Sequence, residues 1–187
     1  RRDLHDYKNQ LTCIQGLLLE DRREEALHYV ETLNGKLRKN ADFVNTNHAV
    51  VNVVLNQKYQ SALERNITML LSVNDLSGLT MREEDLVTLL VNLLDNAVEA
   101  CEKLEENRVI RFKMVLEEGE LILSVRNPVA VPVIIDGKRI VTTKKDGGNH
   151  GIGLLNVNGV IERSGGTSAL RCEDGWFCFS AMIPAAE

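Results

Sequence analysis

The sequence predicts an α+β fold in which an N-terminal antiparallel helical hairpin, dimerising into a four-helix bundle, precedes a two-layer α/β sandwich. Two observations along the chain predict this fold. Residues 4–37 carry apolar residues at alternating spacings of three and four, whereas residues 49–184 alternate between helical stretches and paired strand patterns. The polar, Asn-rich stretch at residues 40–48 separates the two parts. We therefore expect one domain at residues 1–44 and a second at residues 45–187.

The first helix is predicted by a heptad seam of apolar side chains, namely Leu4, Tyr7, Leu11, Ile14 and Leu18. A turn near residues 20–24 leads to a second, more charged helix, whose apolar stripe is Ala26, Val30, Leu33 and Leu37. An isolated pair of such helices leaves apolar surface exposed, so a homodimer with a four-helix bundle is expected. A monomeric hairpin folded back on the rest of the chain is the alternative.

The second part is expected to contain, in order, a helix over 49–66, a strand over 67–73, a long helix over 83–105, a hairpin over 108–127, a glycine-containing loop, a helix over 151–165 and a hairpin over 167–184. Thr80 and Glu83 have the spacing of a capping box at the start of the long helix. The first hairpin is expected to turn at Glu118 and Gly119. This order of helices and strands predicts helices on one face of an antiparallel or mixed sheet.

Composition and length exclude several classes of function. The 187 residues carry a net charge of -5, which gives no broad positive surface for nucleic acid. The four cysteines include no CxxC pair and no zinc-ligand spacing, so a reducing compartment without a structural metal is expected. No apolar run approaches the roughly 18 to 20 residues that a membrane helix needs. Because the chain begins without Met inside a heptad pattern, we expect a soluble piece of a longer protein.

The long helix combines an apolar stripe with a polar face of unusual composition. The apolar stripe comprises Leu86, Leu89, Leu93, Ala97, Ala100 and Leu104, and the polar face comprises Asn92, Asp95, Asn96, Glu99 and Lys103. A solvated face is the ordinary interpretation of such a pattern. Two asparagines at i and i+4 are less ordinary, because Asn is a mediocre helix former. Its recurrence inside a helix indicates that the side-chain amide makes a specific interaction. An amide oxygen suits a hard cation such as Mg²⁺, which shares its remaining ligands with water and phosphates.

A second polar segment, "TTKKDGGNHGIGLLNV" at residues 142–157, combines four glycines with Lys144 and Lys145. The glycines permit close backbone approach, and the helix that follows directs its free N–H groups and its positive dipole end at the loop. Alone, this pattern is more often a flexible loop than a phosphate site. Together with the Asn face it predicts a phosphate-binding loop. Neither a P-loop nor a dinucleotide-binding fingerprint is present.

These motifs resemble a known family. "NLLDNAVEA" at residues 92–100 resembles the N box, and "GIGLLNV" at residues 151–157 the second G box, of the ATP-binding (GHKL, Bergerat-type) fold shared by histidine kinases, gyrase, heat-shock protein 90 and mismatch-repair ATPases. "LHDYKNQL" at residues 4–11 resembles the phosphoacceptor helix of the peptide-pheromone (Agr-type quorum-sensing) sensor histidine kinases, whose signature is His-Asp-Tyr/Phe-x-Asn. The resemblance covers essentially the whole chain.

The resemblance implies a cytoplasmic two-component kinase core that uses ATP and Mg²⁺, phosphorylates itself on His5 and passes the group to an aspartate of a response regulator. It also implies Asp6 as the group that orients the imidazole and takes its proton. Asn9 corresponds to a position that orients water for dephosphorylating the partner. The expected nucleotide-binding residues are Asn92, Asn96, Asn127, Lys144, Lys145, Gly151 and Gly153, with Asn96 as the metal ligand. Contact with a bacterial plasma membrane is expected only through a missing N-terminal sensor region.

Several positions depart from the family pattern. The first G box, Asp-x-Gly-x-Gly, is replaced by "RNPVAVP" at residues 126–132, so that Asn127 stands where the wider family reads adenine with Asp. Glu99 stands where many histidine kinases have a Lys or Arg near the phosphates. The resemblance therefore assigns the neutralisation of phosphate charge to Lys144 and Lys145, in a mobile lid expected over residues 130–150. Leu4 precedes the histidine where many Agr-type members have a basic residue. Asn92 replaces the catalytic Glu of gyrase-like ATPases, which favours a kinase over an ATPase.

Two other functions fit parts of the sequence. A phosphate relay module with a decayed ATP site would explain the missing first G box. A serine kinase of the anti-sigma type shares the ATP fold but has no need of the "HDYKN" helix.

Overall fold

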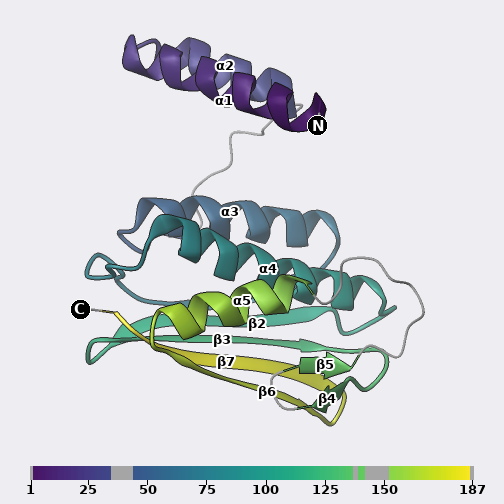
Figure 1. Cartoon of the computed structure of the whole chain (residues 1–187). Coiled ribbons are helices and arrows are strands. Elements are labelled where there is room, and N and C mark those ends of the chain that lie inside the picture. The colour runs from purple at the N-terminus through teal and green to yellow at the C-terminus, as the bar shows by residue number, and fades with distance from the viewer. Residues whose placement is uncertain (1, 35–43, 137–138, 142–151, 186–187) are drawn as a thin grey trace. The chain divides into compact units, whose positions relative to one another are not determined.

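The computed structural model describes residues 2–34, 44–136, 139–141 and 152–185. The chain divides into two compact units, Arg1–Ala41 and Asp42–Glu187, which are described separately (Figure 1). Val44 is buried in the core of the second unit, so this unit begins upstream of the predicted boundary between residues 44 and 45. The roles assigned to the two parts stay predictions.

The first unit contains α1 (Arg2–Leu19) and α2 (Arg23–Asn34), which contact each other. The turn between them is tight, because Asp21 adopts a left-handed conformation with φ 57° and the Arg22 backbone N–H donates to Leu17 O at 2.9 Å. Apolar residues are nevertheless prominent on the surface of this unit, where Leu11, Leu18 and Leu27 are each more than half exposed. Among the described residues, no helix is both long and apolar enough to span a bilayer.

The second unit is built on a mixed five-stranded sheet with the order β1-β2-β3-β7-β6. Its strands are β1 (Thr68–Val73), β2 (Val109–Glu117), β3 (Glu120–Pro128), β6 (Thr167–Glu173) and β7 (Trp176–Pro184). β1 pairs with β2 in parallel, and the other neighbours are antiparallel. The helices α3 (Ala49–Glu64), α4 (Glu83–Glu102) and α5 (Ile152–Arg163) cover one face of this sheet (Figure 1). The predicted α+β class with helices on one face is confirmed.

The two faces of the sheet differ in chemistry. On the helix side, alternate residues of β3 such as Leu121, Leu123 and Val125 are buried in one core with the α4 leucines. On the opposite face lies Trp176, with the guanidinium carbons of Arg111 and Arg126 at 5.5 and 5.7 Å from its ring centroid. The arginines stack over apolar surface while their charges stay in water.

Both predicted hairpins are confirmed, with two-residue turns. Glu118 and Gly119 join β2 to β3 with φ of 51° and 81°, and Asp174 and Gly175 join β6 to β7 with φ of 52° and 76°. Positive φ at both central positions is the geometry that matches the twist of a two-residue hairpin.

Three local predictions are wrong. The capping box fails because the N-cap of α4 is Arg82, without a side-chain cap bond, while the Thr80 hydroxyl donates to Ala185 O. The long helix ends at Glu102 rather than at residue 105. The segment predicted as a lid loop contains a two-stranded sheet of β4 (Ile134–Asp136) and β5 (Arg139–Val141).

Candidate functional site

The polar face of α4 is partly covered rather than solvated. α4 lies over β2 and β3 and contacts both α3 and α5. Its buried stripe is therefore wider than the sequence predicts, and Asn92, Asp95 and Asn96 are half-buried, whereas Glu99 is exposed. The acidic residues of the first turn, Glu83 to Asp85, stabilise α4 because their negative charge lies at the positive end of the helix dipole. This arrangement holds the two predicted asparagines on a rigid, partly desolvated helix.

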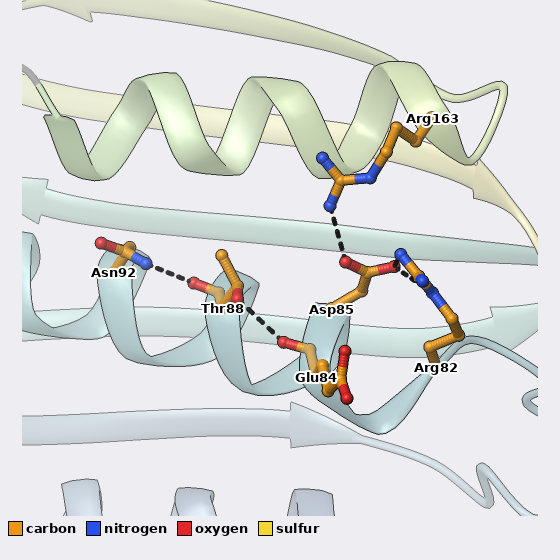
Figure 2. Close-up of polar contacts among 6 residues, drawn as sticks. All are labelled: Arg82, Glu84, Asp85, Thr88, Asn92 and Arg163. Atoms are coloured by element: carbon orange, nitrogen blue, oxygen red, sulfur yellow. Dashed lines mark hydrogen bonds and ion pairs between the residues drawn. The ribbon is translucent and has the colours of Figure 1, made fainter. Parts of the chain in front are cut away.

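Asn92 and Gly153 lie together where α4 meets the first turn of α5. The Asn92 side-chain Nδ2 donates to Thr88 O at 2.7 Å, which fixes the amide and leaves its oxygen directed away from the helix (Figure 2). A Cβ added to Gly153 would lie 2.9 Å from Asn92 Oδ1, closer than real Cβ contacts allow. Glycine at this position therefore permits the first turn of α5 to approach the amide.

Asp85 forms an ionic clamp between the other ends of the same two helices. Its Oδ1 accepts from Arg163 Nη2 at 2.7 Å, and its Oδ2 accepts from Arg82 Nε and Nη2 at 3.0 and 2.9 Å (Figure 2). The Asp85 side chain is 9% exposed, whereas both arginines remain more than half exposed. Burial by itself raises the pKa of Asp85, but the hydrogen bonds from Arg163 and Arg82 outweigh it, so the net pKa lies below its ordinary value.

The clamp and the Asn92 contact together fix the direction of α5. Asp85 at the start of α4 meets Arg163 at the end of α5, while Asn92 meets Gly153 at the start of α5. The two helices are therefore antiparallel, and the free N–H groups of α5 lie at the Asn92 end. Asp85 was not among the predicted site residues, although an acidic residue directly before Leu86 of the apolar stripe was a usable signal.

Asn127 is also buried on the helix side of the sheet. It is 2% exposed, it continues the inward-facing row of Leu123 and Val125 at the end of β3, and its Nδ2 donates to Pro128 O at 3.0 Å. This buried amide at the strand end interrupts the row of apolar residues that precede it.

The remaining predicted site residues are only partly described. His5 and Asp6 belong to α1, but their side chains lie outside the described part of the chain, and Asn9 is exposed on the same helix. Lys144, Lys145 and Gly151 lie outside the described residues. The structure thus brings Asn92 and Gly153 together, and the roles of His5, Asp6, Asn9, Lys144, Lys145 and Gly151 stay predictions.

The α4–α5 junction fits a magnesium-bound nucleotide. Among the described residues, no group of three or more His, Cys, Asp or Glu side chains gathers as a metal site. Asn92 and Asn96 carry amide oxygens on this face of α4, and the Gly153 backbone, which has no Cβ, lies beside the Asn92 amide. A Mg²⁺ ion that keeps most of its ligands as water and phosphate needs few protein donors.

Comparisons with known proteins agree with this fold. The family model described as the GHKL domain matches residues 81–184. A structure of the catalytic domain of the histidine kinase ThkA is similar with a TM-score of 0.59 and 18% identity, covering 76% of this chain and 96% of that chain. The Acinetobacter baumannii histidine kinase AdeS gives a TM-score of 0.52 and 19% identity over 98% of both chains.

The histidine kinase domain of a blue-light-activated kinase from Erythrobacter litoralis gives a TM-score of 0.53 and 10% identity over 99% of this chain and 95% of that chain. Among curated protein sequences none matches. At these identities the similar structures establish the fold, which is that of histidine kinase catalytic domains. Because the GHKL model matches more than half of the residues, the chain belongs to the GHKL domain family.

Proposed function

We propose that this chain is the catalytic core of a dimeric sensor histidine kinase of the peptide-pheromone (Agr-type) subfamily. The observation that carries the proposal is the junction of Asn92 with Gly153, which joins the predicted N box to the predicted second G box in a GHKL domain. The "HDYKN" motif on α1 supplies the phosphoacceptor in the same chain.

Nucleotide binding is assigned to the helix side of the second unit. Asn96 would hold Mg²⁺, Asn92 would bind the surrounding water and phosphates, and the buried Asn127 would accept from the adenine amino group. Lys144 and Lys145 would neutralise phosphate charge, and Gly151 and Gly153 would allow the α5 backbone to approach the nucleotide. When bound, Mg²⁺ offsets negative charge on the phosphates during phosphoryl transfer.

The chemical step is assigned to His5. An imidazole nitrogen attacks the terminal phosphorus of ATP, the bond to the bridging oxygen breaks, and ADP leaves. Asp6 orients the ring and takes the proton that the imidazole loses. The phosphoryl group then passes to an aspartate of a response regulator, and Asn9 orients the water that later removes it.

Dimerisation is assigned to an antiparallel hairpin of α1 and α2. Leu11, Leu18 and Leu27 expose 58%, 54% and 61% of their surface in the single chain. Because only about half of each side chain is still exposed, covering the three would contribute roughly half of the 1.5 to 3 kcal/mol that full burial of each leucine gives, or about 2 to 5 kcal/mol per chain. A four-helix bundle would cover them.

Incubation of the chain with labelled ATP and Mg²⁺, followed by site mapping, tests the proposal. Acid-labile phosphate is expected on His5, and His5→Gln is expected to abolish it while nucleotide binding persists. His28→Gln on α2 is the matched control and is expected to be phosphorylated normally. Acid-stable phosphate on serine would identify the anti-sigma type of kinase instead, and a chain that binds no nucleotide would support the relay module.

Calorimetric titration tests the metal assignment separately. Asn96→Ala is expected to abolish Mg-ATP binding without unfolding the chain, since one half-buried amide is removed from a helix that favours Ala. Gln57→Ala, which removes an exposed amide from α3, is the control. Unchanged affinity in Asn96→Ala would count against Asn96 as the metal ligand.

A further inference from the structure

Two ion pairs link α3 to α4 in the same register. Lys58 Nζ lies 2.6 Å from Asp95 Oδ1, and Arg65 Nε lies 2.7 Å from Glu102 Oε1. Each residue of the second pair lies seven positions, or about two helical turns, after its counterpart in the first. The two helices therefore run parallel, and the pairs are two equivalent links between them.

The two pairs differ in their exposure to water. The Arg65 and Glu102 side chains are 44% and 45% exposed, so this pair is an ordinary surface contact. The Lys58 side chain is only 16% exposed, whereas that of Asp95 is 47% exposed. A lysine that has given up most of its hydration depends on its carboxylate partner, and here the partner keeps one side open to solvent.

Asp95 also occupies a sensitive place on α4. It directly precedes Asn96 and follows Asn92 by three residues, so all three belong to the half-buried polar face of the helix. A negative charge there would repel an incoming triphosphate through Coulomb interaction unless a cation neutralises it. Lys58, reaching across from α3, is the cation in contact with Asp95.

We propose that Lys58 is a positioning residue for nucleotide binding, acting through Asp95 by neutralising its carboxylate beside the proposed phosphate site. The inference rests on the proposed function. It makes α3, which carries none of the family motifs, part of the machinery that admits an anionic nucleotide.

The test compares four variants of the full chain by calorimetric titration with Mg-ATP and by thermal unfolding without nucleotide. Lys58→Met leaves the Asp95 charge uncompensated and is expected to weaken affinity on the order of fivefold, with a deficit that shrinks at high salt. Asp95→Asn is expected to keep or improve affinity, and the double variant is expected to recover the wild-type value. Arg65→Met, which breaks the other pair, is expected to bind like the wild type.

Opposite signs for the two single variants distinguish charge neutralisation from simple packing. Equal losses of affinity in Lys58→Met and Asp95→Asn, or a double variant no better than Lys58→Met, would overturn the inference. Should Lys58→Met fail to fold, weaker binding in Asp95→Asn at an unchanged unfolding midpoint would overturn it independently. A wild-type chain that binds no Mg-ATP would overturn the proposed function itself, which is a different result from wild-type binding that ignores Lys58.

Discussion

Replacing Asp85 by Asn should loosen the attachment of α5 to α4. The substitution keeps the shape of the side chain but removes the charge that accepts three N–H bonds from Arg82 and Arg163. An amide has one acceptor oxygen, so the other end of the side chain would present N–H donors to a guanidinium. A charge-assisted bond of a buried group contributes about 1.5 to 3 kcal/mol.

The exposed arginines reduce that figure. Arg82 and Arg163 are 66% and 56% exposed, so water replaces much of what they lose. We therefore expect the free energy of unfolding to fall by about 2 kcal/mol. For a domain of this size that corresponds to a lowering of the unfolding midpoint by about 5 °C.

Thermal unfolding of Asp85→Asn beside Glu84→Gln measures this effect. Glu84 is exposed in the same helical turn, so its variant removes an equal charge from the helix start without touching the clamp (Figure 2). A midpoint for Asp85→Asn within about 1 °C of the Glu84→Gln midpoint would refute the clamp as a stabilising contact.

The same clamp predicts a dependence on pH. Because the pKa of Asp85 is lower in the folded chain than in the unfolded chain, its contribution to stability is complete above the unfolded value of about 4 and is lost as pH falls through the folded value. The wild type should therefore lose more stability than Asp85→Asn between about pH 5 and the folded pKa. Parallel curves for the two proteins over that range would contradict this assignment.

Three further predictions concern single residues. Gly153→Ala should leave the unfolding midpoint unchanged or slightly raised, because Ala favours a helix. It should nevertheless weaken Mg-ATP binding in calorimetry, because the added Cβ displaces the Asn92 amide. Unchanged binding would contradict that contact. Asn56→Ala should lower the free energy of unfolding, measured by denaturant titration, by about 1 to 3 kcal/mol, because the buried Asn56 amide accepts from Val44 N and donates to Val44 O. A loss below about 0.5 kcal/mol would argue against a stabilising role for these two hydrogen bonds. Burial raises the pKa of the Cys101 thiol to about 11, so this thiol should react slowly with an alkylating reagent at pH 8. Mass spectrometry after alkylation should find the exposed Cys13 modified and Cys101 intact. Equal labelling of the two cysteines would show that Cys101 is open to solvent.

The sequence predicted the fold class well because hairpin turns and apolar periodicity are local signals. Glu118-Gly119 and the strands around it need only their own residues to be recognised. β4 and β5 were missed because each has three residues, which is too short for a periodic pattern. The capping box at Thr80 was wrong because the helix begins only at Glu83, with Arg82 as its N-cap, while the Thr80 hydroxyl donates to the distant carbonyl of Ala185.

The candidate site was less predictable, because the sequence pattern used to predict it also occurs at a place where its residues have a structural role. Asn at i and i+4 was used to predict a ligand site at Asn92 and Asn96. Asn52 and Asn56 on α3 have the same spacing, yet their amides bond the backbone of Thr46 and Val44, which fixes the segment entering the second unit. The spacing indicates that the amides make specific interactions. Whether these interactions are with a ligand or with the backbone depends on the tertiary contacts of the helix.

Trp176 gives this molecule an optical probe in a useful place. It is the only tryptophan of the chain, and it lies on the face of the sheet opposite to the helices that carry Asn92 and Gly153. Unfolding would move the indole away from the Arg111 and Arg126 guanidinium groups into water and change its emission, whereas a nucleotide arriving on the helix side would not touch it. Tryptophan fluorescence can therefore report the integrity of the sheet independently of binding, so that folding and binding effects of each variant are separated in one sample.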